Sequence, residues 1–425
     1  DDLYRLRLAF CSVRDEDLAH LSGLTELRLL DLTDTFIGGA GLAHLRDYLS
    51  LEELNLSHSD LTDEGLPHLR HHTNLERLDL SGTTVTDAGL WYVRDLTQLR
   101  ELRVGSNSIT DAGVAHLRHL SALEELYLAG EGVTDAGLAY LEGHLALRRL
   151  YLPDTRITDA GMTQLGKLAG LRELDLSYTS LGDAGLRDLR ALDALQELYL
   201  SGTSVTDEGM AALSGLIALR RLSLEETAVT DAGLLQLEGL TDLRRLELAG
   251  TSVEGSGLAC LHGLTGLREL DLRETRVGDA GLQHLEGLTS LESLDLSHTR
   301  ATDAGMQHVG RLSGLLHLDL SHTGIQGEGL RCLGGLPALE GLRLIGTPLG
   351  DEGSPYLAGL STVRHLHLGA TGLTDEGLVH LYNLTGLRSL ELWESGVSAE
   401  GVAALQQALP DCKISYTQRS KRAHI

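Results

Sequence analysis

The 24-residue stretch LERLDLSGTTVTDAGLWYVRDLTQ, residues 75–98, decides the fold because the chain restates it from end to end. The pattern LxxLxLSxTxVTDAGLxxLxGLT begins seventeen times between Leu3 and Leu387, with no inserted or deleted residue. A constant period of roughly 20 to 29 residues is typical of stacked units that are too small to bury their apolar side chains alone. We therefore expect a repetitive stack.

Each repeat is predicted to begin with a short strand and to continue into a short helix. In LxxLxL we expect Leu102 and Val104 to point inward and Arg103 to point outward. The threonine of the ninth place, such as Thr83, suits a hydroxyl bond to neighbouring turn backbone in the stack, which predicts a structural ladder. The Thr-Asp pair of TDAGL offers capping oxygens, and the leucines after it recur at helical spacing.

Neighbouring repeats must pair their strands in parallel on one side, so their helices line the other side. The predicted fold class is α/β, a solenoid curved like a horseshoe, with a parallel β-sheet on the concave face and short helices on the convex face. Strands ~4.8 Å apart would give a concave sheet on the order of 80 Å long. Such a face can bind a macromolecule.

The pattern LxxLxLSxTxVTDAGL resembles the leucine-rich repeats. It is most similar to bacterial 24-residue forms and to the cysteine-containing repeats of F-box substrate receptors. The ninth place holds Asn in the classical family and Cys in the cysteine-containing class, whereas here it holds mostly Thr. The resemblance covers nearly the whole chain and implies a protein-binding scaffold, which is an analogy from the fold and not evidence about a site.

The regular period predicts one elongated domain over residues 1–416, made of about 17 repeats and a C-terminal capping strand. Pro410 is expected to stop the last helix, and Ile414 and Tyr416 fall in strand register. Residues 417–425 are expected to form a basic C-terminal tail.

Composition argues against several classes of function. The formal net charge of −26 opposes nucleic-acid binding and favours a protein partner with a basic patch. No run of 18 apolar residues occurs, so we expect no membrane insertion. The four cysteines are scattered and form no metal-binding or disulfide framework, which is compatible with the cytoplasm or with a bacterial secreted protein. Arginine far outnumbers lysine, a bias associated with bacterial genomes.

The first candidate site contains tyrosines at the fifth place of the repeat, where aspartate is the default residue. Exposed tyrosines there would offer apolar area and a hydroxyl at low entropic cost, as interface hot spots do. The alternative is that the rings stack only to stabilise neighbouring strands. The candidate partner-binding residues of this region are Arg103, Tyr127, Arg149, Tyr151, Tyr178 and Tyr199.

The second candidate site is a row of four carboxylates at the fifth place. In-register pairing would set them ~4.8 Å apart, and their repulsion should raise some pKa values. We interpret the row as a docking surface for a basic partner, or alternatively as solubilising charge. Nearby histidines make a metal conceivable, but parallel side chains do not converge as a metal site requires. The four residues are Glu247, Asp271, Asp295 and Asp319.

No serine or cysteine stands beside a base in a defined pocket, so we expect no catalytic residue, no cofactor and no metal. The leading hypothesis is a monomeric, non-enzymatic scaffold that binds a protein on its concave face. One alternative is the substrate-recognition domain of a larger effector or ubiquitin-ligase-like protein, whose catalytic part would precede Asp1. The other is a structural or surface-adhesion spacer.

Overall fold

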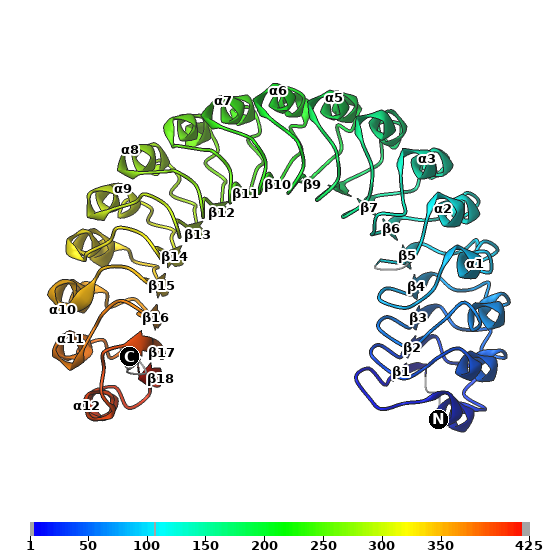
Figure 1. The fold of residues 1–425 in the computed structure, drawn as a ribbon, viewed down its shortest axis with the longest axis horizontal. Helices are drawn as coiled ribbons and strands as arrows, with labels where there is room; N and C mark the ends of the chain where they lie inside the picture. Colours follow the sequence, from blue (N-terminus) through cyan, green and yellow to red (C-terminus); the bar gives the residue numbers. More distant parts are fainter. Residues whose placement is uncertain (1–3, 106–107, 419–425) are drawn as a thin grey trace, which may run out of the picture. The chain divides into compact units, whose positions relative to one another are not determined.

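The computed structural model of the chain describes residues 4–105 and 108–418. The predictions for Leu3 and for the basic residues after Gln418 lie outside these ranges. The chain divides into two compact units, Asp1–Val205 and Thr206–Ile425, called unit 1 and unit 2 below. In each unit, short strands line the inner side of an arc and short helices line its outer side (Figure 1).

Unit 1 builds a parallel sheet in which each strand pairs with the next one along the chain. The register steps by one whole repeat, so that Leu102 of one strand lies opposite Leu126 of the next. The strands of unit 1 are β1 (Arg5–Arg7), β2 (Leu29–Asp31), β3 (Glu53–Asn55), β4 (Arg77–Asp79), β5 (Glu101–Arg103), β6 (Glu125–Tyr127), β7 (Arg149–Tyr151), β8 (Glu173–Asp175) and β9 (Glu197–Tyr199).

Short α-helical or 3₁₀ turns follow these strands and cover the other side of unit 1. They are η1 (Asp15–Leu21), η2 (Ala40–Leu45), η3 (Leu66–Leu69), α1 (Asp87–Leu90), α2 (Asp111–Leu117), α3 (Asp135–Leu138), η4 (Ala139–Leu141), η5 (Asp159–Gly161), α4 (Met162–Leu165), α5 (Asp183–Leu186) and η6 (Arg187–Ala191).

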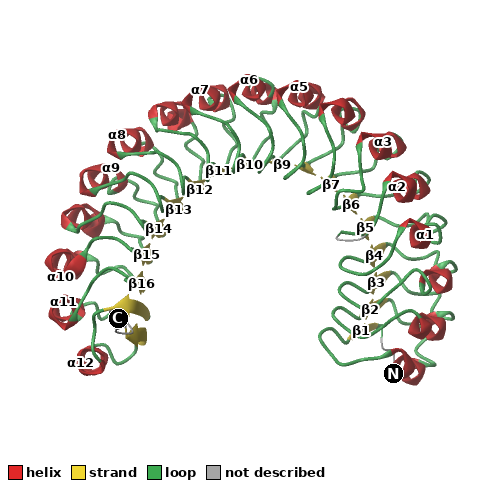
Figure 2. Cartoon of the chain, in the orientation of Figure 1, coloured by secondary structure: helices red, strands yellow, loops and turns green. Residues whose placement is uncertain are grey.

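Unit 2 repeats the same arrangement, with Leu294 opposite Leu318 in neighbouring strands. Its strands are β10 (Arg221–Ser223), β11 (Arg245–Glu247), β12 (Glu269–Asp271), β13 (Ser293–Asp295), β14 (His317–Asp319), β15 (Gly341–Arg343), β16 (His365–His367), β17 (Ser389–Ser395) and β18 (Lys413–Gln418). Figure 2 separates them in colour from the helices. The helices of unit 2 are α6 (Asp207–Met210), η7 (Leu213–Gly215), α7 (Asp231–Leu234), η8 (Leu235–Leu237), η9 (Ser256–Gly263), α8 (Asp279–Leu282), η10 (Gln283–Leu285), η11 (Asp303–Gly305), α9 (Met306–Val309), η12 (Glu328–Gly335), α10 (Gly350–Gly353), η13 (Ser354–Gly359), α11 (Asp375–Leu378), η14 (Val379–Leu381) and α12 (Ala399–Ala408).

The predicted alternation of the strands is confirmed. Leu102 and Val104 are fully buried, whereas Arg103 between them is partly exposed. Because successive repeats contribute the same buried places, from Leu30 onward, each unit contains a continuous leucine core between its sheet and its helices. The α/β leucine-rich solenoid fold is therefore present in each unit.

At ninth-place threonines such as Thr227 and Thr251, the hydroxyl bond lies within one turn and not, as the ladder predicted, between repeats. Their hydroxyls instead donate to a carbonyl three residues earlier in the same turn, as from Thr227 to the Leu224 oxygen at 2.6 Å. Thr251 bonds the Leu248 oxygen in the same way. A turn closed by its own backbone and side chain needs no partner in the stack, so the prediction of an inter-repeat ladder at this place was wrong.

One recurring set of side-chain bonds between neighbouring repeats comes from TDAGL. The Asp111 carboxylate accepts from the Thr134 backbone nitrogen at 2.8 Å and from the Thr134 hydroxyl at 2.6 Å. Thr134 in turn caps helix α3 by accepting from the Ala136 nitrogen. A Cβ on Gly137 would lie 2.5 Å from Asp111 Oδ1, so the glycine admits the carboxylate. Threonine, aspartate and glycine of the motif therefore form one device, called the rung below.

The C-terminal end of unit 2 follows the predicted register. Helix α12 ends at Ala408, shortly before Pro410. In strand β18, Ile414 pairs with Leu390 and Tyr416 pairs with Leu392 of β17. Among the residues that the structure describes, no helix is long and apolar enough to cross a membrane.

Candidate functional site

Two of the predicted tyrosines form a ring pair on the strand side of unit 1. Tyr127 ends β6 and lies opposite Tyr151, which ends β7. Their ring centroids are 5.7 Å apart and the planes are inclined at 39°. Both side chains are half-buried. The pair therefore presents a partly open aromatic surface on the concave sheet.

The hydroxyls of this pair differ. Burial raises the pKa of both Tyr127 and Tyr151, and nearby carboxylates raise it further, so both stay neutral. For Tyr151, the Glu173 carboxylate is the main neighbouring group that raises the pKa after burial. The Tyr127 hydroxyl has no hydrogen-bond partner among residues 4–105 and 108–418. Tyr127 can therefore donate to a ligand atom.

The other two tyrosines lie apart from this pair. Asp175 of β8 separates Tyr151 from Tyr199 in the register of the sheet, and the Tyr199 hydroxyl donates to Glu197 Oε2 at 2.6 Å. Tyr178 lies beyond the strand, in a turn at φ +57°, and is 52% exposed. Its ring covers Gly202 of the next repeat. The four tyrosines thus do not form one continuous patch.

The two predicted arginines converge on a residue that sequence reasoning missed. Glu125 of β6 is 2% exposed and lies between them. Its Oε1 accepts from Arg103 Nη2 at 2.5 Å, and its Oε2 accepts from Arg149 Nε at 2.5 Å. Arg103 also donates to Glu101 at 2.8 Å. Both arginines are therefore held by carboxylates of the chain and form a rigid border beside the tyrosine pair.

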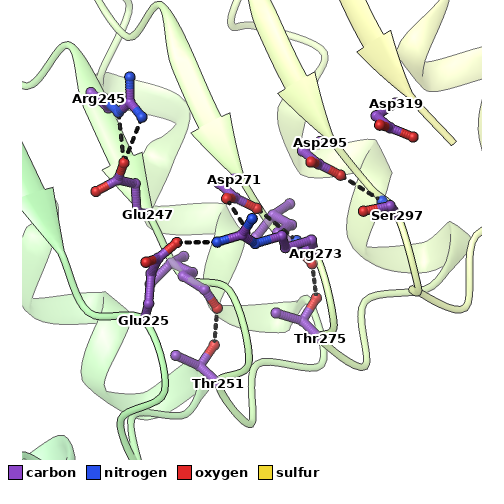
Figure 3. A network of polar contacts seen from close by, with 12 residues as sticks. Glu225, Arg245, Glu247, Thr251, Asp271, Arg273, Thr275, Asp295, Ser297 and Asp319 are labelled. Atoms are coloured by element: carbon purple, nitrogen blue, oxygen red, sulfur yellow. Dashed lines mark hydrogen bonds and ion pairs between the residues drawn. The ribbon is translucent and has the colours of Figure 1, made fainter. Parts of the chain in front are cut away.

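The predicted acidic row exists, but its first member is not an open charge. Glu247, Asp271, Asp295 and Asp319 occupy successive strands in register (Figure 3). Glu247 is 6% exposed and accepts from Arg221 at 2.9 Å and from Arg245 at 2.7 Å. Burial alone would raise the pKa of Glu247, but these two arginines outweigh it and lower the pKa. Glu247 therefore belongs to a buried ion cluster and presents no free charge.

Asp271 shows the predicted rise in pKa. Burial is the largest cause and the charge of Asp295 adds to it, which raises the pKa of Asp271 to about 6. Arg273 opposes this shift, at 3.3 Å from Asp271 Oδ2, but it is shared with Glu225 at 2.8 Å (Figure 3). Burial contributes more than the repulsion along the row that the sequence suggested.

The last two members border a hollow of about 330 Å³ on the strand side of unit 2. Asp295 accepts from the Ser297 nitrogen at 2.8 Å, whereas Asp319 also lies 3.5 Å from Arg343. Within the described residues, Asp295 is the one member of the row without an ion pair. The residues that line the hollow are Ser293, Leu294, Asp295, His317, Leu318, Asp319, Gly341, Leu342, Arg343, His365 and His367.

Gly341 is the glycine among the residues that line the hollow. The third place of the repeat carries a side chain in every other strand that the structure describes, such as His317 and His365 on either side. A Cβ on Gly341 would lie 2.6 Å from His317 Nδ1, so the His317 ring leans over the glycine. A glycine at a place that otherwise carries side chains is the sequence signal that points to this position.

The histidines near the row do not converge on a metal site. His298 and His322 stack face to face, with centroids 4.3 Å apart and planes inclined at 18°. Within the described part of the chain, no group of three or more His, Cys, Asp or Glu side chains has the arrangement to hold a metal ion.

A second hollow, of about 400 Å³, lies on the strand side of unit 1 over β1 to β5. Charges of both signs alternate around it, and Arg103 joins it to the border of the tyrosine pair. Sequence reasoning selected only Arg103 of its lining residues and did not identify the hollow. Its charged and amide lining residues are Arg7, Asp31, Glu53, Asn55, Arg77, Asp79, Glu101 and Arg103.

A sequence model described as a leucine-rich repeat region matches residues 126–354, more than half of the chain. The chain belongs to the leucine-rich repeat family. A second leucine-rich repeat model matches residues 49–66, 71–90, 96–117 and 359–381. No curated protein sequence matches the chain significantly.

Solved structures of leucine-rich repeat proteins share the fold at low sequence identity. A leucine-rich repeat protein of Leptospira interrogans is 20% identical, with a TM-score of 0.66 over 94% of this chain and 97% of that chain. An internalin of Listeria monocytogenes is 22% identical, with a TM-score of 0.59 over 80% of this chain and 86% of that one. The Arabidopsis receptor kinase HAESA, solved with the peptide hormone IDA and the co-receptor SERK1, is 18% identical, with a TM-score of 0.58 over 98% and 70%.

Proposed function

We propose that this chain is a protein-binding scaffold and that it recognises its partner on the strand side of unit 1. The observation that carries the proposal is the half-open Tyr127–Tyr151 pair beside the Arg103–Glu125–Arg149 border. Tyrosine is a frequent hot-spot residue because a rigid ring buries a large apolar area at little entropic cost. The Tyr127 hydroxyl, which has no hydrogen-bond partner within residues 4–105 and 108–418, adds one directional bond.

The border residues support this assignment by their rigidity. Arg103 and Arg149 are fixed by Glu125, so a partner would meet a surface that does not have to be ordered on binding. Preorganised side chains lower the entropic cost of association. Tyr199 and Tyr178 would extend the contact towards the end of unit 1, as separate contacts and not as one stack.

Unit 2 supports a second contact, with a basic partner surface. Asp295 and Asp319 open into the hollow over Gly341, and Asp295 has no cation of its own within the described residues. An incoming lysine or arginine side chain would find a carboxylate there that has no ion pair within the described residues. The net charge of −26 attracts such a partner from a distance.

The comparisons favour a protein ligand over another class. HAESA, whose repeat domain shares this fold, was solved with a peptide hormone and a co-receptor bound. Leucine-rich repeat proteins generally act as non-enzymatic interaction scaffolds. We accordingly propose no enzymatic activity for this chain, and a monomer as the binding form.

The test is binding of a captured and purified partner to wild type and to the triple variant Tyr127→Ala, Tyr151→Ala, Tyr199→Ala. We expect Kd to rise at least about tenfold, because removal of a hot-spot ring typically costs 2 kcal/mol or more. The matched control is Tyr140→Ala, a 39% exposed tyrosine in η4 on the helical side. An unchanged Kd in the triple variant would refute the assignment of this surface.

The second contact is tested by Asp295→Asn with Asp319→Asn. We expect slower association and a weaker dependence of Kd on salt, because the carboxylates steer a basic partner. Glu238→Gln with Glu400→Gln removes the same charge from exposed positions on the helical side and should change Kd little. Equal effects of the two pairs would mean that only net charge matters.

A further inference from the structure

The twenty-second place of the repeat contains three polar exceptions in unit 1. This place holds leucine in most repeats, such as Leu96 and Leu120, and these side chains are fully buried. Tyr48, His72 and His144 replace it. Both histidines are 0% exposed and Tyr48 is 2% exposed, so all three polar rings lie in the leucine core. Their polar atoms must therefore find partners there.

All three side chains bond the same place of the preceding repeat. The Tyr48 hydroxyl donates to the Leu21 oxygen. His72 Nε2 lies 2.9 Å from the Leu45 oxygen, and His144 Nε2 lies 3.1 Å from the Leu117 oxygen. Each bond spans 27 residues of sequence and joins two neighbouring repeats through the core.

The bond to the preceding repeat places a proton on Nε2 of each imidazole. A carbonyl oxygen only accepts, so Nε2 must carry the proton in the bond to the preceding repeat. Nδ1 of His72 lies 3.2 Å from the Leu69 oxygen, and that oxygen already accepts the His72 backbone N–H at 2.9 Å. His144 repeats this arrangement with Leu141. The neutral ring already makes the inter-repeat bond, so a second proton, on Nδ1, would add a charge to a ring that is 0% exposed in the leucine core.

We propose that His72 and His144 make acid-sensitive links between repeats. They stabilise unit 1 while the rings are neutral, and the stability of unit 1 falls as the medium becomes acidic. The His144 bond joins the repeat whose strand carries Tyr127 to the preceding repeat, whose strand carries Arg103. Tyr48 makes the equivalent bond with a group that stays neutral in this range of pH.

Burial sets the direction of the effect. It lowers the pKa of both rings below 6.5, and the backbone carbonyls only partly offset it. Below pH 6.5 the unfolded chain therefore binds protons that the folded chain refuses, and stability is lost as pH falls. His71 also disfavours the proton on His72. In the repeats on either side of His72, the same place is occupied by Tyr48 and Leu96. In the repeats on either side of His144, it is occupied by Leu120 and Leu168.

The test uses the full chain and replaces each histidine with the leucine that the repeat normally carries. Hydrogen exchange of amides in residues 40–75 and 112–147 is compared between wild type and His72→Leu with His144→Leu, at pH 7.5 and pH 5.5. The exchange rate of each amide in the variant is divided by its rate in wild type at the same pH, which removes the intrinsic effect of pH on exchange. We expect the variant to gain relative protection at pH 5.5, by up to about tenfold for each ring.

Two further proteins make the result decisive. His72→Gln with His144→Gln keeps a neutral donor in each site and should lose the pH effect in the same way. His44→Gln removes an exposed histidine of η2 and should leave the ratio independent of pH. The proposal is overturned if the leucine and glutamine variants keep the same ratio to wild type at both pH values, or if wild type gains relative protection on acidification.

Discussion

The ring of Tyr127 lies directly against Gly105 of the preceding repeat. A Cβ on Gly105 would lie 2.2 Å from Tyr127 Cε1 and 2.7 Å from Tyr127 Cδ1. Gly105 is buried, and the atoms that it meets belong to a side chain that can rotate. The position of the Tyr127 ring therefore depends on the absence of a side chain at residue 105.

Gly105→Ala should displace the Tyr127 ring and leave the fold intact. Because contact between the Tyr127 and Tyr151 rings requires the present position, we expect the nuclear Overhauser effects between them to weaken strongly, while the melting temperature changes by only a few degrees. Gly143→Ala adds the same methyl group in unit 1 where nothing lies within 4 Å, and it should leave the ring contact unchanged. Persistence of the contact in Gly105→Ala would contradict the geometry.

Removal of one rung should destabilise unit 1 measurably. Asp111→Ala leaves the Thr134 N–H and hydroxyl without their acceptor, and an unsatisfied, partly buried donor costs about 1–3 kcal/mol. Urea unfolding measures the loss. Asp95→Ala, whose carboxylate is 67% exposed beside Arg94, should cost less than about 0.5 kcal/mol. Similar losses of unfolding free energy in the two variants would show that the rung does not stabilise unit 1.

The same-turn bond of the ninth place predicts a separate loss. Thr227→Val keeps the shape of the side chain but removes the hydroxyl that donates to the Leu224 oxygen. We expect the free energy of unfolding to fall by about 1 kcal/mol, the usual net value of one such bond. Thr227→Ser keeps the donor and should lose less. A larger loss for serine than for valine would show that the methyl group, and not the bond, stabilises the turn.

Replacement of Asp271 should increase stability in a pH-dependent way. Its pKa of about 6 in the folded chain exceeds the ordinary 3.8, so ionisation destabilises the folded state as pH rises through this range. Asp271→Asn removes the ionisation and should raise the free energy of unfolding at pH 7.5 by about 1–2 kcal/mol, less than the full shift because Arg273 loses its partner. Near pH 4 the difference should vanish. Urea unfolding at both pH values measures the difference. Asp175→Asn, at the same repeat place in β8, is the control.

The repeat pattern made the fold predictable because the same physical demand recurs in every unit. Leu102 and Val104 alternate with Arg103 for the reason that any half-buried strand alternates, and stacking supplies the partners. Family membership confirms the resemblance to leucine-rich repeats. The direction of the ninth-place hydroxyl was not predictable, because bonds within a turn and between turns require the same residue type.

The candidate surfaces were less accessible to sequence reasoning. The fifth place correctly identified side chains on the strand face, including Tyr127 and Tyr151. It could not show that Glu125 fixes two arginines or that Glu247 is buried, because those contacts come from residues at other places in neighbouring repeats. Sequence reasoning also missed His72 and His144, which occupy the twenty-second place, where most repeats have leucine.

The rung has a consequence for how such a chain can change its length. Aspartate and threonine must stand 23 residues apart for the carboxylate to reach the next cap, as Asp111 and Thr134 do. Loss or duplication of one whole 24-residue segment restores that spacing at the new junction, whereas any other insertion between the pair breaks it. Unequal recombination between gene segments could therefore lengthen or shorten the array in whole modules, each junction closing with contacts that already exist.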